Sequence, residues 1–313
     1  MSENKEPKFV SAVVYVHNNE SVVEQKLSLI DSELSAHFER YEIICVNDAS
    51  TDSSVDSIKQ FSKKISAGAL TVINLSFYHG LESAMTAGVD LAIGDFVYEF
   101  DTLGADFPKE TITDIYSHCL TGYDIVSAGP EKNPRFASKI YYKIFNSALN
   151  APHALEHDVV RIVTRRALNR VHGMSQTIPY RKALYATCGL KTAVLHYRTT
   201  EKSEDKRTTG EKAGFAFHSL VLFTSLAYKI AFALSVIMMI FAAGVGIYAC
   251  VTFFGGGNPI DGWTSTMLFL SAGFFGIFVL LGIILKYLSV VVDLVFNKQK
   301  YFVESVEKVN NRR

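Results

Sequence analysis

The sequence predicts an α/β domain built on a mostly parallel sheet, followed by amphipathic interfacial helices and two transmembrane helices. Three observations lead to this prediction. Short β-branched apolar runs alternate with helical periods over the first hundred residues. A basic amphipathic segment follows them. Two long apolar stretches then occupy most of the last hundred residues.

Strands and helices alternate from the start of the chain. Apolar β-branched runs predict strands at residues 9–16, 41–46, 70–75 and 96–100. Apolar residues at helical spacing predict helices at residues 22–38, 54–65 and 81–92. This alternation is typical of right-handed crossovers between parallel strands, whose carboxyl ends meet at one edge of the sheet. Ligands bind beyond that edge, where the polar clusters at residues 17–20, 47–52 and 101–106 are expected.

Residues 135–150 form an amphipathic pattern downstream of these strands. Its basic residues recur at every fourth position: Arg135, Lys139 and Lys143. A solvated helix face and an interfacial helix under anionic headgroups both explain the stripe, and the nearby apolar stretches favour the membrane. Residues 198–212 form a charged loop, read either as a mobile lid or as a linker. A juxtamembrane helix is expected at residues 213–229.

Two apolar stretches, residues 230–254 and 264–288, are long enough to cross a bilayer. Roughly 25 helical residues extend about 37 Å, against a hydrocarbon core of about 30 Å. The linker at residues 255–263 has no Lys or Arg, whereas several basic residues follow the second stretch. The positive-inside rule therefore predicts a two-pass protein of the inner (plasma) membrane. Both termini, the domain at residues 1–212 and a tail at residues 289–313 are expected in the cytoplasm.

Composition narrows the class of protein further. The 31 basic and 31 acidic residues leave no net charge, so non-specific nucleic-acid binding has no electrostatic support. No signal peptide is expected, because residues 1–8 are polar and residues 9–16 are too short for one. The four cysteines lack metal-type spacing and are expected to pack in cores or helices in a reducing compartment: Cys45, Cys119, Cys188 and Cys250.

Acidic residues at the predicted strand ends are the candidates for chemistry. Asp48 and Asp52 follow the second strand, where they can accept hydrogen bonds from a nucleoside or cap the next helix. Asp101 ends the fourth strand, and Asp106 follows five residues later. Two such carboxylates can hold Mg²⁺ or Mn²⁺ on a diphosphate, or they can belong to a helix-capping turn. The residues alone do not decide between nucleoside binding and helix capping for Asp48 and Asp52, or between metal binding and a capping turn for Asp101 and Asp106.

A collinear set of segments spans nearly the whole chain. In order, the segments are VVYVHNNE (13–20), VNDASTD (46–52), LSFYHGLESAMTAG (75–88), DTLGADFP (101–108), VRIVTRR (160–166) and the loop at residues 207–212. This order resembles the membrane-bound family 2 (GT-A) polyprenyl-phosphate glycosyltransferases, related to dolichol-phosphate mannose synthase and bactoprenol glucosyltransferase. The resemblance implies a GT-A Rossmann-like fold. It also implies inverting sugar transfer from a nucleotide-diphosphate sugar to undecaprenyl or dolichyl phosphate.

The resemblance also implies roles for particular residues. Donor binding falls to Asn18, Glu20, Asp48, Asp52 and His79. Asp101 and Asp106 are implied as catalytic carboxylates that hold Mg²⁺ or Mn²⁺. Arg161 is predicted as a third catalytic residue and as the first candidate for the acceptor phosphate, with Arg135, Lys139 and Arg165 behind it. Cationic side chains, guanidinium groups above all, suit phosphate oxygens. The acceptor phosphate is largely dianionic at neutral pH and needs no general base.

The partners follow from this reading. They are a nucleotide-diphosphate sugar, with a UDP-sugar expected first, a polyprenyl phosphate and the membrane. A flippase and a downstream glycosyltransferase would use the lipid-linked sugar for cell-surface glycans. Glycines in both apolar stretches permit close helix packing and a homo-oligomer.

Two segments depart from the family pattern. The usual Asp-X-Asp has Leu103 in its second acidic position, and Phe77-Tyr78 replaces an Arg-Asn pair. Two alternatives therefore stay open. One is a catalytically inactive scaffold in a membrane glycan-assembly complex. The other is a glycosyltransferase whose acceptor is a lipid-linked oligosaccharide or diacylglycerol.

Overall fold

The computed structural model describes residues 5–66, 68–104, 106–131, 146, 158–174, 180–198, 233–234, 237–238, 240–241, 244, 263–296 and 301–309. The chain divides into two compact units. The first contains residues 1–209 together with residues 298–313, and the second contains residues 210–297. The C-terminal segment therefore returns to the unit in which the chain begins.

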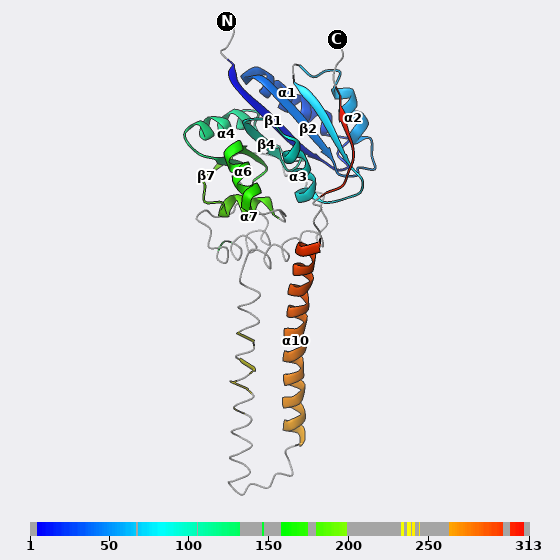
Figure 1. Cartoon of the computed structure of the whole chain (residues 1–313), viewed down its shortest axis with the longest axis vertical. Helices are drawn as coiled ribbons and strands as arrows, with labels where there is room; N and C mark the ends of the chain where they lie inside the picture. The colour runs from blue at the N-terminus through cyan, green and yellow to red at the C-terminus, as the bar shows by residue number, and fades with distance from the viewer. Residues whose placement is uncertain are drawn as a thin grey trace. The chain divides into compact units, whose positions relative to one another are not determined.

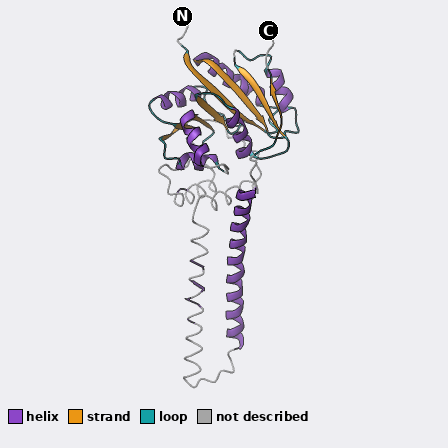
Figure 2. Cartoon of the chain, in the orientation of Figure 1, coloured by secondary structure: helices purple, strands orange, loops and turns teal. Residues whose placement is uncertain are grey.

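A mixed sheet forms the centre of the first unit (Figures 1 and 2). Its strands are β1 (Glu6–Val16), β2 (Phe38–Asn47), β3 (Ala69–Leu75), β4 (Phe96–Phe100), β5 (Ile125–Pro130), β6 (Val160–Thr164), β7 (Thr192–Tyr197) and β8 (Val303–Lys308). Their order in space is β7-β5-β6-β4-β1-β2-β3-β8. Neighbours among β1 to β4 pair in parallel, as the sequence predicts. Strand β6 is antiparallel to β4 and β5, and β8 is antiparallel to β3.

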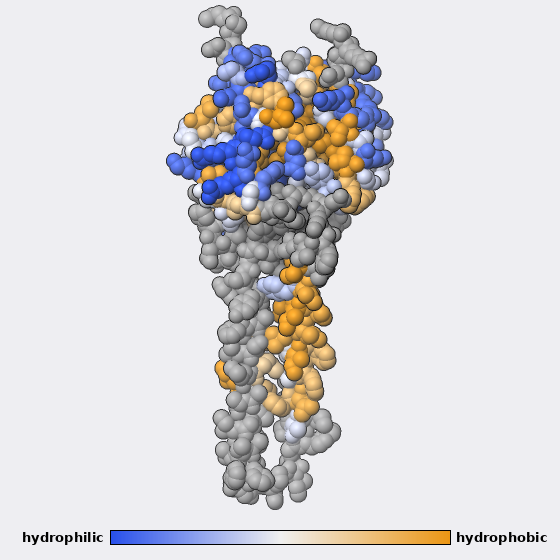
Figure 3. Space-filling view, viewed as in Figure 1, coloured by the Kyte–Doolittle hydropathy of each residue, from blue (hydrophilic) through white to orange (hydrophobic). Residues whose placement is uncertain are grey.

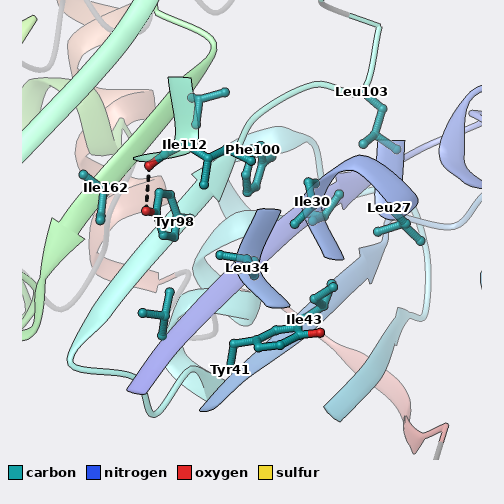
Figure 4. Packing of buried hydrophobic residues seen from close by; sticks show 14 of the residues in the cluster. Leu27, Ile30, Leu34, Tyr41, Ile43, Tyr98, Phe100, Leu103, Ile112 and Ile162 are labelled. Carbon is teal, nitrogen blue, oxygen red and sulfur yellow. Dashed lines mark hydrogen bonds between the residues drawn. The ribbon is translucent and has the colours of Figure 1, made fainter. Parts of the chain in front are cut away.

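Helices cover both faces of this sheet. Those of the first unit are α1 (Val23–His37), α2 (Ser54–Phe61), α3 (Leu81–Leu91), α4 (Thr111–Leu120), α6 (Arg165–Met174) and α7 (Arg181–Thr187). Apolar residues of α1, α2 and α4 share one buried cluster with the sheet. Figure 4 shows Leu27, Ile30 and Leu34 of α1 in this cluster together with Ile43 and Phe100 of the sheet. The apolar periodicity of α1 and α2 is what predicts these two helices in the sequence.

Helix α3 packs on strands β1 and β2 through a glycine. A Cβ atom built at Gly88 would lie 2.3 Å from Val13 Cγ1 and 2.7 Å from Val46 Cγ2. Val13 and Val46 alternate with the strand residues that face α1, so they point to the opposite face. The first unit therefore has helices on both sides of its sheet, and the carboxyl ends of β1 to β4 meet at one edge.

The second unit contains α10 (Trp263–Phe296), a helix of 34 residues. Large apolar side chains along it, such as Phe275 and Phe278, are mostly exposed. Figure 3 shows this helix as a largely hydrophobic surface. Helix α10 contains the predicted stretch at residues 264–288 and continues beyond it. Within the described residues, no helix combines the length and the apolarity that a membrane span requires. The prediction of two transmembrane helices therefore stays a prediction.

Other predicted segments fall outside the described residues. Residues 135–145 and 147–150 are among these, so the interfacial helix and its Arg135 and Lys139 have no structural description. The same holds for the juxtamembrane segment at residues 213–229. Within the predicted tail at residues 289–313, helix α10 continues to Phe296 and strand β8 joins the sheet. The cytoplasmic location of this tail stays a prediction.

Candidate functional site

The loops that follow β1 and β2 are bound to each other by side-chain hydrogen bonds. The Oδ1 of Asn18 accepts a hydrogen bond from the backbone N–H of Thr51 at 2.8 Å. Glu20 Oε2 accepts from the Ser53 N–H at 3.0 Å, and the Glu20 N–H donates to Asp52 Oδ2 at 3.0 Å. The structure therefore brings together Asn18, Glu20 and Asp52, three of the residues predicted to bind the donor. Their contact with a nucleotide stays a prediction.

Asp52 also supports the start of helix α2. Its Oδ1 accepts hydrogen bonds from the backbone N–H and the hydroxyl of Ser54. Burial alone would raise the pKa of Asp52, but the hydrogen bonds from Ser54 and from the Glu20 backbone lower it below its ordinary value. Asp52 is therefore ionised at neutral pH. The N-cap of α2 is Ser53, so Asp52 holds the turn just before the helix and is not its N-cap.

Asp48 is fully buried and organises the turn after β3. Its carboxylate accepts hydrogen bonds from the backbone N–H groups of His79 at 2.7 Å and Gly80 at 2.9 Å. The Tyr15 hydroxyl donates to the same carboxylate at 3.1 Å. Burial, followed by the charge of Asp48, raises the pKa of Tyr15. Both oxygens of Asp48 are thus used within the chain, which fixes the turn that leads into α3.

His79 connects this turn to the C-terminal segment. Its ring stacks on Phe77, with centroids 4.0 Å apart. Its Nε2 lies 3.1 Å from the backbone N–H of Phe302, and its Nδ1 lies 2.5 Å from the Phe77 carbonyl oxygen. Since a backbone N–H can only donate, Nε2 accepts and Nδ1 carries the proton. The imidazole predicted to touch the donor sugar therefore joins two backbone segments.

Asp101 lies just beyond β4 in a buried ionic cluster. Its Oδ1 accepts a hydrogen bond from Arg181 Nη2 at 2.7 Å. Arg161 Nη2 and Lys182 Nζ lie 3.6 and 3.8 Å from Oδ2. Burial would raise the pKa of Asp101, but these cations, Arg181 above all, lower it below its ordinary value. Asp101 is consequently a carboxylate in the folded protein.

Further charges complete this cluster. Arg161, on β6, is only 3% exposed, and it pairs with Glu99 at 2.5 Å and with Asp158 at 2.7 Å. The members are the carboxylates Glu82, Glu99, Asp101 and Asp158, the cations Arg161, Arg181 and Lys182, and the hydroxyl of Tyr185. Arg161 thus lies beside Asp101, but its guanidinium contacts carboxylates of its own chain. Its predicted contact with an acceptor phosphate stays a prediction.

Two predicted site residues lie apart from the ionic cluster. Asp106 is half exposed, and its Oδ1 pairs with Lys26 Nζ at 3.2 Å. Arg165 donates to the carbonyl oxygens of Ala92 at 2.8 Å and Gly94 at 2.7 Å. The Arg165 guanidinium therefore binds backbone carbonyls just after α3, and its predicted contact with an acceptor phosphate stays a prediction.

The position of Leu103 explains the altered Asp-X-Asp segment. Its side chain is 2% exposed and belongs to the buried apolar cluster (Figure 4). Since a carboxylate at this position would be buried among apolar side chains, the local structure favours leucine. Asp101 is therefore the strand-end acid of this segment, with Asp106 further along.

A divalent cation is implied by the family resemblance, and the donor atoms suit one. Carboxylate oxygens are the ligands preferred by Mg²⁺ and Mn²⁺. Among the described residues, no group of three or more acidic, histidine or cysteine side chains is placed to bind a metal. Such ions are commonly held by one or two carboxylates together with substrate phosphates. Asp101 and Asp106 supply oxygens of this kind, but in the structure the Asp101 carboxylate pairs with Arg181 and the Asp106 carboxylate with Lys26. Joint binding of a cation by these two acids therefore stays a prediction.

Several members of the ionic cluster escaped the sequence analysis: Glu82, Glu99, Asp158, Arg181, Lys182 and Tyr185. A signal for Glu99 was present, because it is an acid inside the otherwise apolar strand Phe96–Phe100. Arg181 begins a short helix and is 1% exposed. Its Nε and Nη1 have no hydrogen-bond partner among the described residues. A buried charge of this kind is more informative than an exposed one.

Comparison with known proteins agrees with this arrangement. Residues 11–168 match the family model described as glycosyl transferase family 2. A protein of Proteus mirabilis named undecaprenyl-phosphate 4-deoxy-4-formamido-L-arabinose transferase is 24% identical over 312 residues, which cover 95% of this chain and 93% of that protein. An Aeromonas hydrophila protein of the same name is 31% identical over 125 residues, covering 39% and 37%. A Synechocystis glycosyltransferase is 26% identical over 95% of both chains.

Solved structures resemble the fold. A mannosyltransferase of Pyrobaculum calidifontis, solved with GDP-mannose and Mn²⁺, aligns with a TM-score of 0.53 and 15% identity over 94% of this chain and 89% of that chain. Glucosyl-3-phosphoglycerate synthase of Mycobacterium tuberculosis aligns with a TM-score of 0.50 and 12% identity over 68% and 78%. At these identities the likeness shows the fold alone, which is the GT-A-like sheet that the sequence predicts.

Proposed function

Because the chain belongs to glycosyl transferase family 2, we propose that it transfers a sugar from a nucleotide-diphosphate sugar to undecaprenyl or dolichyl phosphate. The observation that carries the proposal is the matched region, residues 11–168. It contains the interlocked loops after β1 and β2, the turn around His79 and the strand-end acid Asp101. The names of the Proteus and Aeromonas relatives support a polyprenyl phosphate as the acceptor.

The proposed reaction is a single displacement at the anomeric carbon. A non-bridging oxygen of the acceptor phosphate attacks this carbon, the bond to the donor diphosphate breaks, and the nucleoside diphosphate leaves. The configuration at the carbon is inverted. Since the acceptor phosphate is already dianionic near neutral pH, no side chain has to remove a proton. The protein must align the two phosphates and balance the charge that develops on the leaving group.

Two groups of residues in this chain would carry out these tasks, one at the nucleoside and one at the diphosphate. The loops held by Asn18, Glu20 and Asp52, with the turn held by Asp48, would form the nucleoside side of the site. Asp101, with Asp106, would hold Mg²⁺ or Mn²⁺, which when bound neutralises charge on the diphosphate. The pairing of Asp101 with Arg181 at 2.7 Å keeps its carboxylate ionised and fixed in direction.

The proposal includes a membrane location. A polyprenyl phosphate lies in a bilayer, so an enzyme that uses it works at the membrane surface. The apolar stretches at residues 230–254 and 264–288 would anchor the chain there, with both termini in the cytoplasm. A flippase and a downstream glycosyltransferase would then consume the lipid-linked sugar.

The test uses full-length protein in detergent with undecaprenyl phosphate, Mg²⁺ or Mn²⁺ and a panel of radiolabelled nucleotide sugars. Label that enters the organic phase measures transfer. We expect one donor to give product, and Asp101→Asn to reduce the rate by about 10²–10³-fold, because an electrostatic contribution to the reaction is lost. Donor preference will identify the nucleotide and the sugar.

Asp101→Asn also breaks a buried ion pair and will lower thermal stability. Asp31→Asn is the matched control, because Asp31 is a buried acid of helix α1 that is not part of the ionic cluster. It accepts hydrogen bonds from the Tyr41 hydroxyl and the Ser66 backbone. The control should lose stability but keep transfer per folded molecule. Full activity of Asp101→Asn would contradict the role of Asp101. A folded protein that labels no lipid with any donor would favour the scaffold alternative.

A further inference from the structure

The chain that follows helix α10 forms the edge strand β8 beside β3. Figure 1 shows this segment in red at the edge of the sheet, beside the cyan strand β3. The Nδ2 of Asn74 donates to the Ser305 hydroxyl at 3.0 Å, and Lys59 pairs with Glu307 at 2.8 Å. The Val309 N–H donates to the Leu70 carbonyl oxygen at 2.9 Å. Strand β8 is therefore part of the first unit and is bonded to β3 from Leu70 to Leu75.

Phe302, just before β8, contacts both ends of the turn that follows β3. Its carbonyl oxygen accepts a hydrogen bond from the Ser76 N–H at 3.0 Å. Its own N–H donates to His79 Nε2 at 3.1 Å. Its ring lies 5.8 Å from the ring of Phe77, centroid to centroid. One residue of the C-terminal segment thus holds residues 76 and 79 at a fixed separation.

The same turn supplies the two N–H groups that bind Asp48. The N–H of His79 and that of Gly80 lie 2.7 and 2.9 Å from the Asp48 oxygens. Gly80 has φ of 82°, a conformation that glycine adopts readily and other residues rarely do. The turn is otherwise exposed, with Phe77 54% and Tyr78 44% accessible. Such a turn needs outside contacts to keep a single conformation.

We propose that Phe302 is a positioning residue for donor binding, acting through His79 and Asp48. The proposal rests on the proposed function, because it assumes that the loop containing Asp48 binds the nucleotide sugar. Tyr301 comes five residues after Phe296, the last residue of α10. The segment after α10 therefore completes the donor side of the site, although it lies far from that site in the sequence.

The test compares two substitutions at one position in the full-length protein. Phe302→Pro removes the backbone N–H that donates a hydrogen bond to His79 Nε2. Proline is tolerated at the start of an edge strand. Phe302→Ala removes the ring but keeps the N–H. His79→Phe removes the acceptor and keeps a ring beside Phe77. Amide hydrogen exchange at His79 and Gly80 is measured without ligands, and donor KM, acceptor KM and kcat are measured with them.

We expect Phe302→Pro to speed exchange at His79 and Gly80 by about 5- to 10-fold and to raise donor KM by a similar factor, as for the loss of one hydrogen bond. Acceptor KM and kcat should change less than about twofold. Phe302→Ala should stay closer to the wild type. His79→Phe combined with Phe302→Pro should add little to either alone, because both remove the same hydrogen bond.

The proposal would be overturned if Phe302→Pro had the amide exchange rates and the donor KM of the wild type. It would also be overturned if Phe302→Pro and Phe302→Ala changed these quantities equally. The exchange measurement also separates this proposal from the proposed function. If no donor supports transfer but Phe302→Pro still exposes the His79 and Gly80 amides, the positioning of the turn holds and the assigned activity fails.

Discussion

Ala49 shows how much a single backbone angle matters at the site. It lies between Asp48 and Ser50 with φ of 50°, in the left-handed region that alanine enters at a cost of about 1–2 kcal/mol. We predict that Ala49→Gly stabilises the protein by about 0.5–1 kcal/mol, since part of that gain is offset by the greater freedom of glycine when unfolded.

Thermal unfolding of the full-length protein checks this prediction. The expected rise in Tm is about 1–4 °C. Ala167→Gly is the matched control, because Ala167 is a buried residue of helix α6 without a positive φ. Glycine there should lower Tm, because it weakens the helix. A fall in Tm for Ala49→Gly would mean that the methyl group contributes contacts worth more than the strain.

Asp158 makes the free energy of unfolding depend on pH in the acidic range. Burial would raise its pKa, but Arg161 and Lys182 lower it below its ordinary value. A carboxyl whose folded pKa is lowered adds stability above its unfolded pKa of about 3.9, and that stability is lost as pH falls below this value. Glu82 acts in the opposite sense, because burial outweighs Arg181 and raises its pKa.

We therefore predict that Tm of the wild type falls as pH decreases from about 5 to 2. In Asp158→Asn the position no longer titrates, so its Tm should be lower at pH 7 and should fall less with acid. Circular dichroism melts at half-unit pH steps give the comparison. Parallel curves for the two proteins would show that Asp158 does not carry this pH dependence.

The residue scale also shows what the sequence could reveal about the site. Asp48, Asp52 and Asp101 were predicted at the strand ends because parallel strands bring their carboxyl ends to one edge. The structure places them after β2 and β4, while their roles in binding stay predictions. The partners of Asp101 were not identified. Arg181 reaches it from a helix 80 residues away in sequence, and no local period encodes such a contact. Arg161 was predicted to bind an acceptor phosphate, and nothing in the sequence indicated that it is buried among carboxylates.

At the scale of elements, Gly88 controls how closely helix α3 packs on the sheet. A Cβ at this position would meet Val13 Cγ1 at 2.3 Å and Val46 Cγ2 at 2.7 Å. Alanine improves helix propensity by about 1 kcal/mol, but overpacking a core costs about 1–3 kcal/mol. We predict that Gly88→Ala lowers stability because the steric cost exceeds the propensity gain.

Gly173→Ala provides the comparison in helix α6. A Cβ at Gly173 would have no neighbour within 4 Å, so only helix propensity should act and Tm should rise or stay constant. Thermal melts of the two variants measure both effects. A rise in Tm for Gly88→Ala would show that α3 can shift away from the strands without loss.

Helices and strands were predictable where the apolar residues repeat with a regular spacing over a continuous stretch of sequence. Strands β1 to β4 and helices α1 to α3 have clear apolar patterns, and the structure confirms them. Strand β8 was not predicted, because Val303–Lys308 is short and half charged, a pattern equally typical of an exposed tail. Its pairing partner, β3, lies more than 200 residues earlier. Helix α7 has only seven residues, too few for its period to be recognised.

At the scale of the whole molecule, the chain leaves the first unit and later returns to it. Residues 210–297 form the second unit, and the strand after them completes the sheet. An inserted unit of this kind is constrained at both of its ends. If residues 230–254 and 264–288 cross a bilayer, two crossings are required, because an even number returns β8 to the side on which β1 begins.

This topology makes a prediction about residues 255–263, which join the two apolar stretches. Their lack of Lys and Arg, with basic residues after the second stretch, predicts that they face the outside.

Labelling of single cysteines tests this orientation. In a background with Cys250→Ala, Asn258→Cys should react with a membrane-impermeant maleimide on intact cells. Ser2→Cys should react only after permeabilisation. Cys45, Cys119 and Cys188 are buried and should contribute little background. Labelling of Ser2→Cys on intact cells would reverse the orientation. Protection of both positions until permeabilisation would place residues 255–263 and the N-terminus on the same side, which excludes a single crossing between them and removes the proposed membrane topology.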